Sequence, residues 1–239
     1  MKALGRWLLL MLLATLALQL FFVLRIALAL WWNPQSTSMQ RSEAWRIWHQ
    51  SVQQRPWQQK WVDYAHISPH LQRAVLTAED DGFVEHDGVQ WNAIERAWER
   101  NQKAIAKAQA KPNAQPAKIY GGSTITQQLA KNLLLSGERS FLRKGQELLL
   151  AHALELLLSK QRILEIYLNN VEWGQGIFGA EAAARFYFRK SAAQLTPNEA
   201  AKLAVMLPRP RYYELNPNSR YLQARTHTIA RRMNATPLP

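Results

Sequence analysis

The chain has 239 residues, of which 48% are hydrophobic, so it is long enough to form one sizeable folded domain and a further segment. Its 30 Lys and Arg against 17 Asp and Glu give a formal net charge of +13, which favours anionic partners such as nucleic acid, acidic lipid headgroups or phosphorylated substrates. The sequence contains no cysteine, which excludes a disulfide framework, a thiolate metal site and a cysteine nucleophile.

The N-terminal part of the chain contains an uncharged apolar segment. Residues 7–24 carry Thr15 and Gln19 as their only polar side chains. As a helix the segment would span roughly 27 Å, close to the thickness of a bilayer core. We therefore predict a cytoplasmic N-terminus over residues 1–6 and a single transmembrane anchor over residues 7–32.

A cleavable signal peptide is the alternative for the same segment. Lys2 and Arg6 would form its basic region, and the small residues of 27–29 loosely fit a cleavage site. The apolar run is longer than in most signal peptides, and Trp31 and Trp32 resemble an interfacial aromatic belt. These features favour an anchor, with the rest of the chain outside the cytoplasm.

The segment after the anchor, residues 33–64, is rich in aromatic side chains. Six of the ten tryptophans lie between positions 31 and 61, interleaved with arginines. This composition predicts a juxtamembrane segment on the membrane surface, where indole rings prefer the headgroup level. The alternative is that these rings belong to the core of a first helix, and both interpretations stay open. The main folded domain is predicted over residues 65–239.

Residues 101–118 form a basic stretch with four lysines, two prolines and no acid. Because such a stretch has little apolar surface to bury, we predict a mobile basic loop. It is either a solvated linker or a basic flap over a site.

The second half of the chain has a helical hydrophobic pattern. No proline lies between residues 118 and 197, and no glycine between residues 145 and 174, so at least two long helices are expected from Phe141 onward. A last helix is predicted to begin at Thr196 and to end before Pro208. Since no segment alternates as a strand would, the domain is predicted to be mainly α.

Residues 79–88 form an acidic cluster at the end of an apolar helix pattern. Five carboxylates within nine positions repel one another, so at least one should have a raised pKa or a cation beside it. A carboxyl group with a raised pKa can act as a general base. The alternative is a solvated acidic turn.

Two further polar segments lie at predicted helix starts. Residues 121–132 lead from a Gly-Gly-Ser-Thr turn into a helix, an arrangement that exposes backbone amides to an anion. In residues 143–147, Glu147 shares a helix face with Arg143 and Lys144, which by itself is typical of an ordinary surface ion pair.

Together these segments resemble, in their order and in their residues, the motifs of the peptidoglycan glycosyltransferases of glycosyltransferase family 51. The short, monofunctional members fit better than class A penicillin-binding proteins, because the Ser-x-x-Lys and Lys-Thr-Gly motifs of a transpeptidase are absent. The resemblance covers about residues 65–235. Its motifs are E-D-x-x-F-x-x-H-x-G at 79–88, G-G-S-T-[IL]-T-Q-Q-x-x-K-N at 121–132, R-K-x-x-E at 143–147, I-L-E-x-Y-L-N at 163–169, and G-x-x-G-x-x-x-A-A at 176–184.

The resemblance implies a lysozyme-like, mainly α fold with two carboxylates in a cleft beside the membrane. Glu79 would deprotonate the sugar 4-hydroxyl of the acceptor, lipid II, whose oxygen attacks the growing glycan chain and releases undecaprenyl diphosphate with inversion. Glu147 would lie near the leaving diphosphate, as the candidate ligand of a divalent cation such as Mg²⁺ or Mn²⁺. The product would be a β-1,4 glycan strand.

The resemblance also implies further residues that would shape the cleft or bind substrate. One position departs from the family pattern, since Gln90 stands where an Asp is common, so a capping carboxylate is missing. The remaining predicted substrate-binding residues are Asp80, Phe83, His86, Ser123, Thr124, Gln128, Lys131, Arg143 and Lys144.

Three other functions compete with this interpretation. A lysozyme-like hydrolase or lytic transglycosylase would use similar carboxylates but would not need cations for a lipid diphosphate. A non-catalytic membrane scaffold would bind the precursor and use the acids only structurally. A nucleic-acid binder is not supported by any usual module. The resemblance places the protein in the bacterial inner membrane with its catalytic domain in the periplasm, in contact with membrane lipids and with division or elongation proteins as candidate partners.

Overall fold

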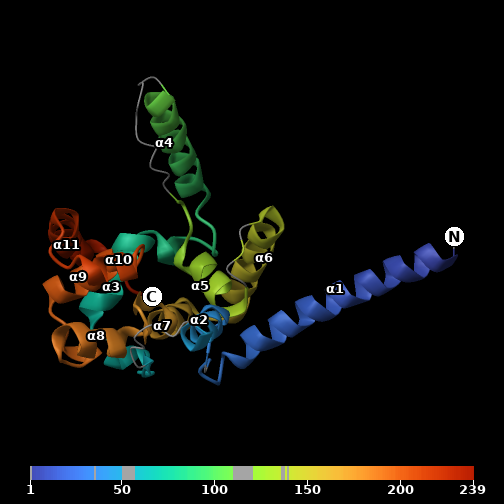
Figure 1. Cartoon of the computed structure of the whole chain (residues 1–239), viewed down its shortest axis with the longest axis horizontal. Helices are drawn as coiled ribbons and strands as arrows, with labels where there is room; N and C mark the ends of the chain where they lie inside the picture. Colours follow the sequence, from blue (N-terminus) through green and yellow to red (C-terminus); the bar gives the residue numbers. More distant parts are fainter. Residues whose placement is uncertain (1, 35, 50–56, 110–120, 136–137, 139) are drawn as a thin grey trace.

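The computed structural model describes the chain except for residues 1, 35, 50–56, 110–120, 136–137 and 139. The described part is mainly helical, which confirms the predicted fold class (Figure 1). Its α-helices are α1 (Lys2–Leu28), α2 (Ser38–His49), α3 (Pro69–Glu79), α4 (Trp91–Gln109), α5 (Ile125–Leu134), α6 (Phe141–Leu157), α7 (Lys160–Asn170), α8 (Ala180–Phe188), α9 (Pro197–Met206), α10 (Pro210–Leu215) and α11 (Arg220–Arg232). The strands are β1 (Gln58–Gln59), β2 (Glu172–Gly174) and β3 (Ile177–Phe178), and the short 3-10 helices are η1 (Tyr64–His66), η2 (Phe83–Glu85), η3 (Ala192–Gln194) and η4 (Met233–Ala235).

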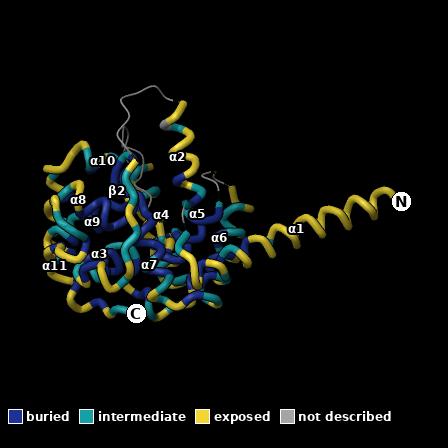
Figure 2. The backbone as a smooth tube through the Cα atoms, turned by 90° about the horizontal axis from the view of Figure 1, so that it is seen from below, coloured by how far each residue is buried: buried dark blue, intermediate teal, exposed yellow. Residues whose placement is uncertain are grey.

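Helix α1 extends from the globular domain as a long rod whose surface is exposed (Figures 1 and 2). Its 27 residues are long and apolar enough to cross a membrane. Its C-terminal end, however, is packed into the domain, where Phe22 and Ile26 are buried and the Arg162 guanidinium donates to Ala29 O across 2.9 Å. These contacts favour an anchor that stays with the domain over a leader that is removed.

The core of the domain is built around α3, α9 and α11. Helix α3 packs against α9, and α9 packs against α11. Apolar side chains such as Leu71 and Val75 of α3 are fully buried against Leu203 of α9. The buried Trp173 donates from its indole N–H to Leu203 O across 3.1 Å, so β2 is tied to the same core.

A small sheet in the order β1-β3-β2 closes one side of the domain. β1 runs parallel to β3, with Gln58 opposite Ile177, and β2 runs antiparallel to β3. Strands of two or three residues are too short to show an alternating pattern, so they could not be predicted from periodicity.

The helix predicted at Thr196 is confirmed as α9, and a capping box between Thr196 and Glu199 satisfies its first backbone N–H groups. The prediction that this helix is the last one is wrong, because α10 and α11 follow. Pro210 occupies the first turn of α10, a position at which its missing N–H costs nothing.

The first half of the basic stretch 101–118, predicted to be a loop, is helical in the structure. Residues 101–109 continue α4, a helix that projects from the domain (Figure 1) and buries Ala97 as its one fully buried side chain among those described. Residues 110–118 lie outside the described residues.

The juxtamembrane segment is attached to the domain through α2. Gln40 Nε2 donates to Asn170 O across 3.3 Å, and Arg211 bridges Glu43 at 2.8 Å and Glu172 at 2.6 Å. Most tryptophans of this region nevertheless face outward, as the membrane-surface interpretation requires. Trp61 packs against the core, whereas the exposed members are Trp31, Trp32, Trp45, Trp48 and Trp57.

Candidate functional site

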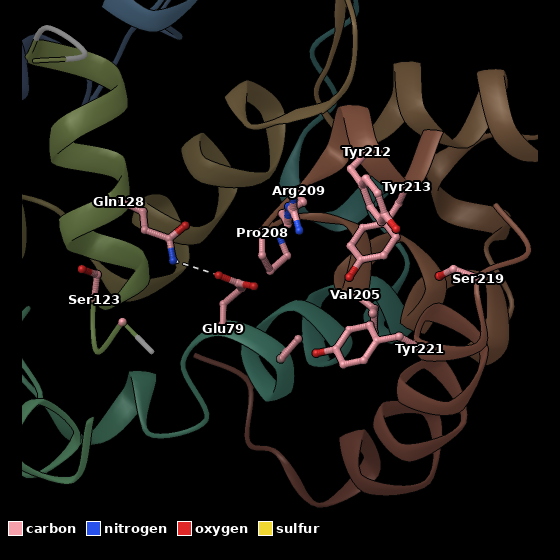
Figure 3. A pocket seen from close by; sticks show the side chains of 12 residues that line it. Glu79, Ser123, Gln128, Val205, Pro208, Arg209, Tyr212, Tyr213, Ser219 and Tyr221 are labelled. Atoms are coloured by element: carbon pink, nitrogen blue, oxygen red, sulfur yellow. Dashed lines mark hydrogen bonds between the residues drawn. The ribbon is translucent and has the colours of Figure 1, made fainter. Parts of the chain in front are cut away.

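Glu79 is the last residue of α3, and its carboxylate points into a cavity of about 630 Å³ (Figure 3). The chain turns sharply at Asp80, so the side chain of Glu79 is released from the helix into the cleft. The wall opposite Glu79 comes from the C-terminal end of α9, from α10 and from the start of α11. The other lining residues are Ala78, Gly121, Ser123, Gln128, Val205, Pro208, Arg209, Tyr212, Tyr213, Ser219 and Tyr221.

A chain of hydrogen bonds orients the Glu79 carboxylate. Gln128 of α5 donates from Nε2 to Glu79 Oε2 across 2.9 Å, and the Tyr167 hydroxyl donates to Gln128 Oε1 across 3.0 Å. Burial raises the pKa of Glu79 and the charge of Asp80 adds to this rise, while the Gln128 hydrogen bond opposes it. The result is a carboxylate with increased proton affinity and a fixed direction, as a general base requires.

The loop that follows Glu79 is held by its own polar groups. The buried Asp80 carboxylate accepts from His86 Nε2 at 2.9 Å and from the backbone N–H of Ile125 at 2.9 Å. Phe83 is buried in the core, and the Thr124 hydroxyl donates to Gly88 O across 2.6 Å. These four predicted substrate-binding residues therefore hold the loop after Glu79 in place against α5 and the core. Their contact with substrate stays a prediction.

The Gly-Gly-Ser-Thr turn leads into α5 as predicted. Thr124 is the N-cap of α5, and its hydroxyl accepts from Gln127 N while the Gln127 side chain accepts from Thr124 N. This capping box fixes the turn, so that Gly121 and Ser123 line the cavity beside Glu79.

The second predicted acid, Glu147, lies buried in the first turns of α6. Its two carboxylate oxygens accept from Arg143 Nη1 at 2.9 Å and from Lys144 Nζ at 2.5 Å. Lys144 also donates to Ser123 Oγ at 3.3 Å, which connects this ion cluster to the cavity. The ion pair is not the ordinary surface contact that its spacing alone suggested.

Lys131 of α5 connects the two acids. Burial lowers its pKa, the Glu147 charge opposes this shift, and the Glu79 charge also acts on it. Glu147 is connected through Lys144 to Ser123, which lines the same cavity as Glu79, so the two acids do not lie on opposite surfaces.

Sequence reasoning missed two groups of residues at this site. Glu155 accepts from the Thr126 hydroxyl at 2.6 Å and from Lys160 Nζ at 2.9 Å, and Lys160 also donates to the backbone carbonyl of His86, so the pair joins α5, α6 and the loop after Glu79. Periodicity gave no signal for this pair, because its partners are distant in sequence.

The aromatic wall of the cavity was also missed. Tyr213 and Tyr221 are nearly parallel, with ring centroids 6.3 Å apart and an interplanar angle of 11°, and Arg209 lies over the Tyr212 ring at 4.7 Å. The run of aromatic and basic residues at 209–213 was the available signal.

The described side chains do not form a metal site on their own. In the part of the chain that the structure describes, no three His, Cys, Asp or Glu side chains converge to hold a metal ion. Both oxygens of Glu147 already accept from cationic side chains. A divalent cation at this position therefore does not fit the protein ligands present, and it stays a prediction from the resemblance.

Comparison with known proteins gives a consistent result. A family model described as Transglycosylase matches residues 47–234. A protein named biosynthetic peptidoglycan transglycosylase from Paraburkholderia phytofirmans is 50% identical over 229 residues, covering 95% of this chain and 89% of the relative. Relatives with the same name from Janthinobacterium sp. (50% identical, 95% and 93% covered) and Herminiimonas arsenicoxydans (47% identical, 98% and 96% covered) are similar over nearly their whole length.

Proposed function

The chain belongs to the transglycosylase family and polymerises peptidoglycan glycan strands, and we propose that Glu79 is the general base of this glycosyl transfer. One observation carries the proposal. The Glu79 carboxylate projects into the cavity, is held there by Gln128, and has a pKa raised mainly by burial. A base of this kind accepts a proton from a sugar hydroxyl more readily than an exposed carboxylate does.

The proposed reaction is a direct displacement between two lipid-linked sugars. Glu79 takes the proton of the acceptor 4-hydroxyl while that oxygen forms a bond to the anomeric carbon of the donor. The bond from this carbon to the diphosphate oxygen breaks, and the lipid diphosphate leaves with the electron pair. Attack and departure occur on opposite faces of the sugar, so the configuration inverts.

The departing diphosphate needs positive charge, which α5 and α6 supply. Arg143 and Lys144 donate to Glu147 on α6, the helix that packs against α1, and the Glu147 charge also acts on Lys131 of α5. We assign Glu147 the role of holding these cations in place rather than contacting the sugar. Fixed cations aimed at a leaving anion stabilise the transition state because they need little reorganisation.

The substrate side of the proposal is lipid II, taken from the membrane. Helix α1 packs against α6, and Phe141 and Leu142 at the start of α6 are 98% and 88% exposed. Such an apolar surface beside a membrane-spanning helix suits contact with lipid. We propose that α1 is a single-pass anchor of the bacterial inner membrane and that the catalytic domain lies on its periplasmic side.

The test uses the purified full chain in detergent or liposomes with labelled lipid II, and products are separated by size. The wild type is expected to form polymer, and Glu79→Gln should lower the rate by about 10²–10⁴-fold because the base is removed. The control is Asp87→Asn, which neutralises an exposed acid of the same loop and should change the rate by about twofold at most. Full activity of Glu79→Gln, or shortening of preformed glycan by the wild type, would refute the proposal.

A further inference from the structure

A second cavity, of about 450 Å³, adjoins the first, and it is not used by the chemistry described above. It shares Glu79, Gly121 and Ser123 with the first cavity. The distinctive part of its lining is a set of four arginines from two helices, here called the arginine basin: Arg96 and Arg100 of α4, and Arg225 and Arg232 of α11.

The charges of the arginine basin are largely uncompensated. Within the described residues, no carboxylate lies within 4.0 Å of the guanidinium nitrogens of Arg96, Arg100 or Arg225. Arg232 approaches Asp81 at 3.8 Å, but both side chains are more than half exposed, so this pair contributes little. The basin therefore presents positive charge beside the catalytic acid.

Of the acids in this cavity, Asp80 does not neutralise the basin, and Glu79 interacts with only one of its four arginines in the described part of the chain. Asp80 is buried and already accepts from His86 and from the Ile125 N–H. The charge of Arg225 reaches Glu79, since burial raises the pKa of Glu79 and Arg225 counteracts part of that rise. An anion bound in the basin would thus be close to the reacting sugars.

The basin is distinct from the cations proposed for the leaving group. Lys131, Arg143 and Lys144 lie on α5 and α6, and α6 packs against the anchor helix α1. Helix α11 lies at the opposite end of the domain from α1 in both views (Figures 1 and 2). A lipid diphosphate held at the membrane end would leave the basin free for another anion.

We propose that the arginine basin binds carboxylates of the peptide stem carried by the sugar substrate. The inference rests on the proposed function, which places a disaccharide-pentapeptide at Glu79. A peptide stem carries at least its terminal carboxylate, and the planar guanidinium group matches a carboxylate with two parallel hydrogen bonds. The volume of the cavity is in the range of sites that enclose small ligands.

The test compares two substrates and two variants of the full chain. The substrates are lipid-linked disaccharide-pentapeptide and the same molecule with its stem carboxylates converted to neutral amides. The variants are Arg96→Gln/Arg100→Gln and the control Lys103→Gln/Lys107→Gln, which removes the same charge from exposed positions of α4 outside the cavity. Polymerisation rates and equilibrium binding, the latter in a Glu79→Gln background, are measured for each combination.

We expect the arginine variant to lose about tenfold in kcat/KM and in affinity for the charged stem, and about twofold or less for the neutral stem. The lysine control should match the unmodified chain on both substrates. Equal losses on both substrates would assign the basin to the diphosphate and overturn the proposal. No loss on either substrate would also overturn it. If the wild type forms no polymer, the proposed function fails. The binding measurement then still tests the basin, because the arginine variant should lose affinity for the charged stem and keep its affinity for the neutral stem.

Discussion

Gln128 Nε2 donates a hydrogen bond to Oε2 of Glu79 across 2.9 Å, from a helix whose start is fixed by its own capping box. The two residues are 49 positions apart in sequence, so their contact depends on α3 and α5 meeting at the cleft. The buried Tyr167 hydroxyl holds the other end of the Gln128 amide. One amide group therefore fixes the direction of the Glu79 carboxylate and opposes the rise in its pKa that burial causes.

Replacing Gln128 with Leu should change the pH dependence of polymerisation. Glu79 acts as a base only when deprotonated, so kcat/KM rises as pH increases through its pKa, which burial has raised. Removing the Gln128 hydrogen bond raises this pKa further, and the acid limb should move to higher pH. A hydrogen bond to a charged group contributes about 1.5–3 kcal/mol, so the loss of kcat/KM on the acid limb should be at least tenfold.

Tyr167→Phe is the control for this prediction. It removes the donor to Gln128 Oε1 but leaves the Gln128 amide able to donate to Glu79, so the acid limb should stay near its wild-type position. Thermal unfolding should show a cost of about 1 kcal/mol for the buried acceptor left unpaired. If both variants moved the acid limb equally, Gln128 would not act directly on Glu79.

Lys131→Arg should remove the alkaline limb of the same profile. The proposed role of Lys131, to stabilise the departing diphosphate, requires its charged form, and burial is the main cause that lowers its pKa. Activity should therefore fall as pH rises through that lowered pKa, at a lower pH than an ordinary lysine would need to lose its proton. Arginine stays charged throughout this range, so the rate of the variant should reach a plateau.

Lys131→Met and Lys202→Arg complete this experiment. The Met variant should lose about 10²–10³-fold in kcat, because a fixed cation at the leaving group is missing. Lys202 of α9 lines neither cavity, so Lys202→Arg should retain the alkaline limb. An unchanged alkaline limb in Lys131→Arg would show that another group sets it.

The predictable part of the site is the part encoded locally. The acid at the end of α3, the Gly-Gly-Ser-Thr turn and the ion cluster around Glu147 each lie within a short stretch. Glu79 and the turn line one cavity, and Lys144 connects the ion cluster to Ser123 of that lining. The helices could be predicted from hydrophobic periodicity and capping residues, because both depend on residues that are close in sequence.

The unpredicted part depends on packing between distant helices. The stacked Tyr213 and Tyr221 face Glu79 only because α10 and α11 fold back against α9, and no local pattern indicates that return. The arginine basin likewise needs α4 and α11 to face each other. The small sheet is stabilised by neighbouring chain segments rather than by strand propensity, since its strands are so short.

Two glycines give opposite predictions for stability. Gly179 has a φ of +82°, and a Cβ there would lie 2.6 Å from Asn169 O, so Gly179→Ala should cost about 2 kcal/mol or more. Gly145 lies inside α6 with nothing within 4 Å of a Cβ, so Gly145→Ala should stabilise the domain by about 0.5–1 kcal/mol. Thermal unfolding of both variants in one detergent checks the pair, and a lower midpoint for Gly145→Ala would show that this exposed position makes a contact elsewhere.

Gln19 and Gln146 form a reciprocal amide pair between the anchor helix α1 and α6, with hydrogen bonds of 3.0 Å and 2.9 Å. Gln146 is adjacent to Glu147, so the pair connects α1 to the helix that carries Arg143, Lys144 and Glu147. Gln19→Leu would leave the Gln146 amide without its partner in apolar surroundings, at a cost of about 0.6–2 kcal/mol. We expect a lower unfolding midpoint and a several-fold lower kcat/KM in liposomes.

Thr15→Val is the matched change on the same helix, because the Thr15 hydroxyl donates only to Met11 O of its own turn, at 2.8 Å. It should leave both measurements unchanged. The double variant Gln19→Leu/Gln146→Leu replaces both partners with apolar groups and should recover most of the lost stability. If Gln19→Leu behaved like Thr15→Val, the amide pair would not couple the anchor to α6, and the position of Glu147 would depend on contacts within the domain alone.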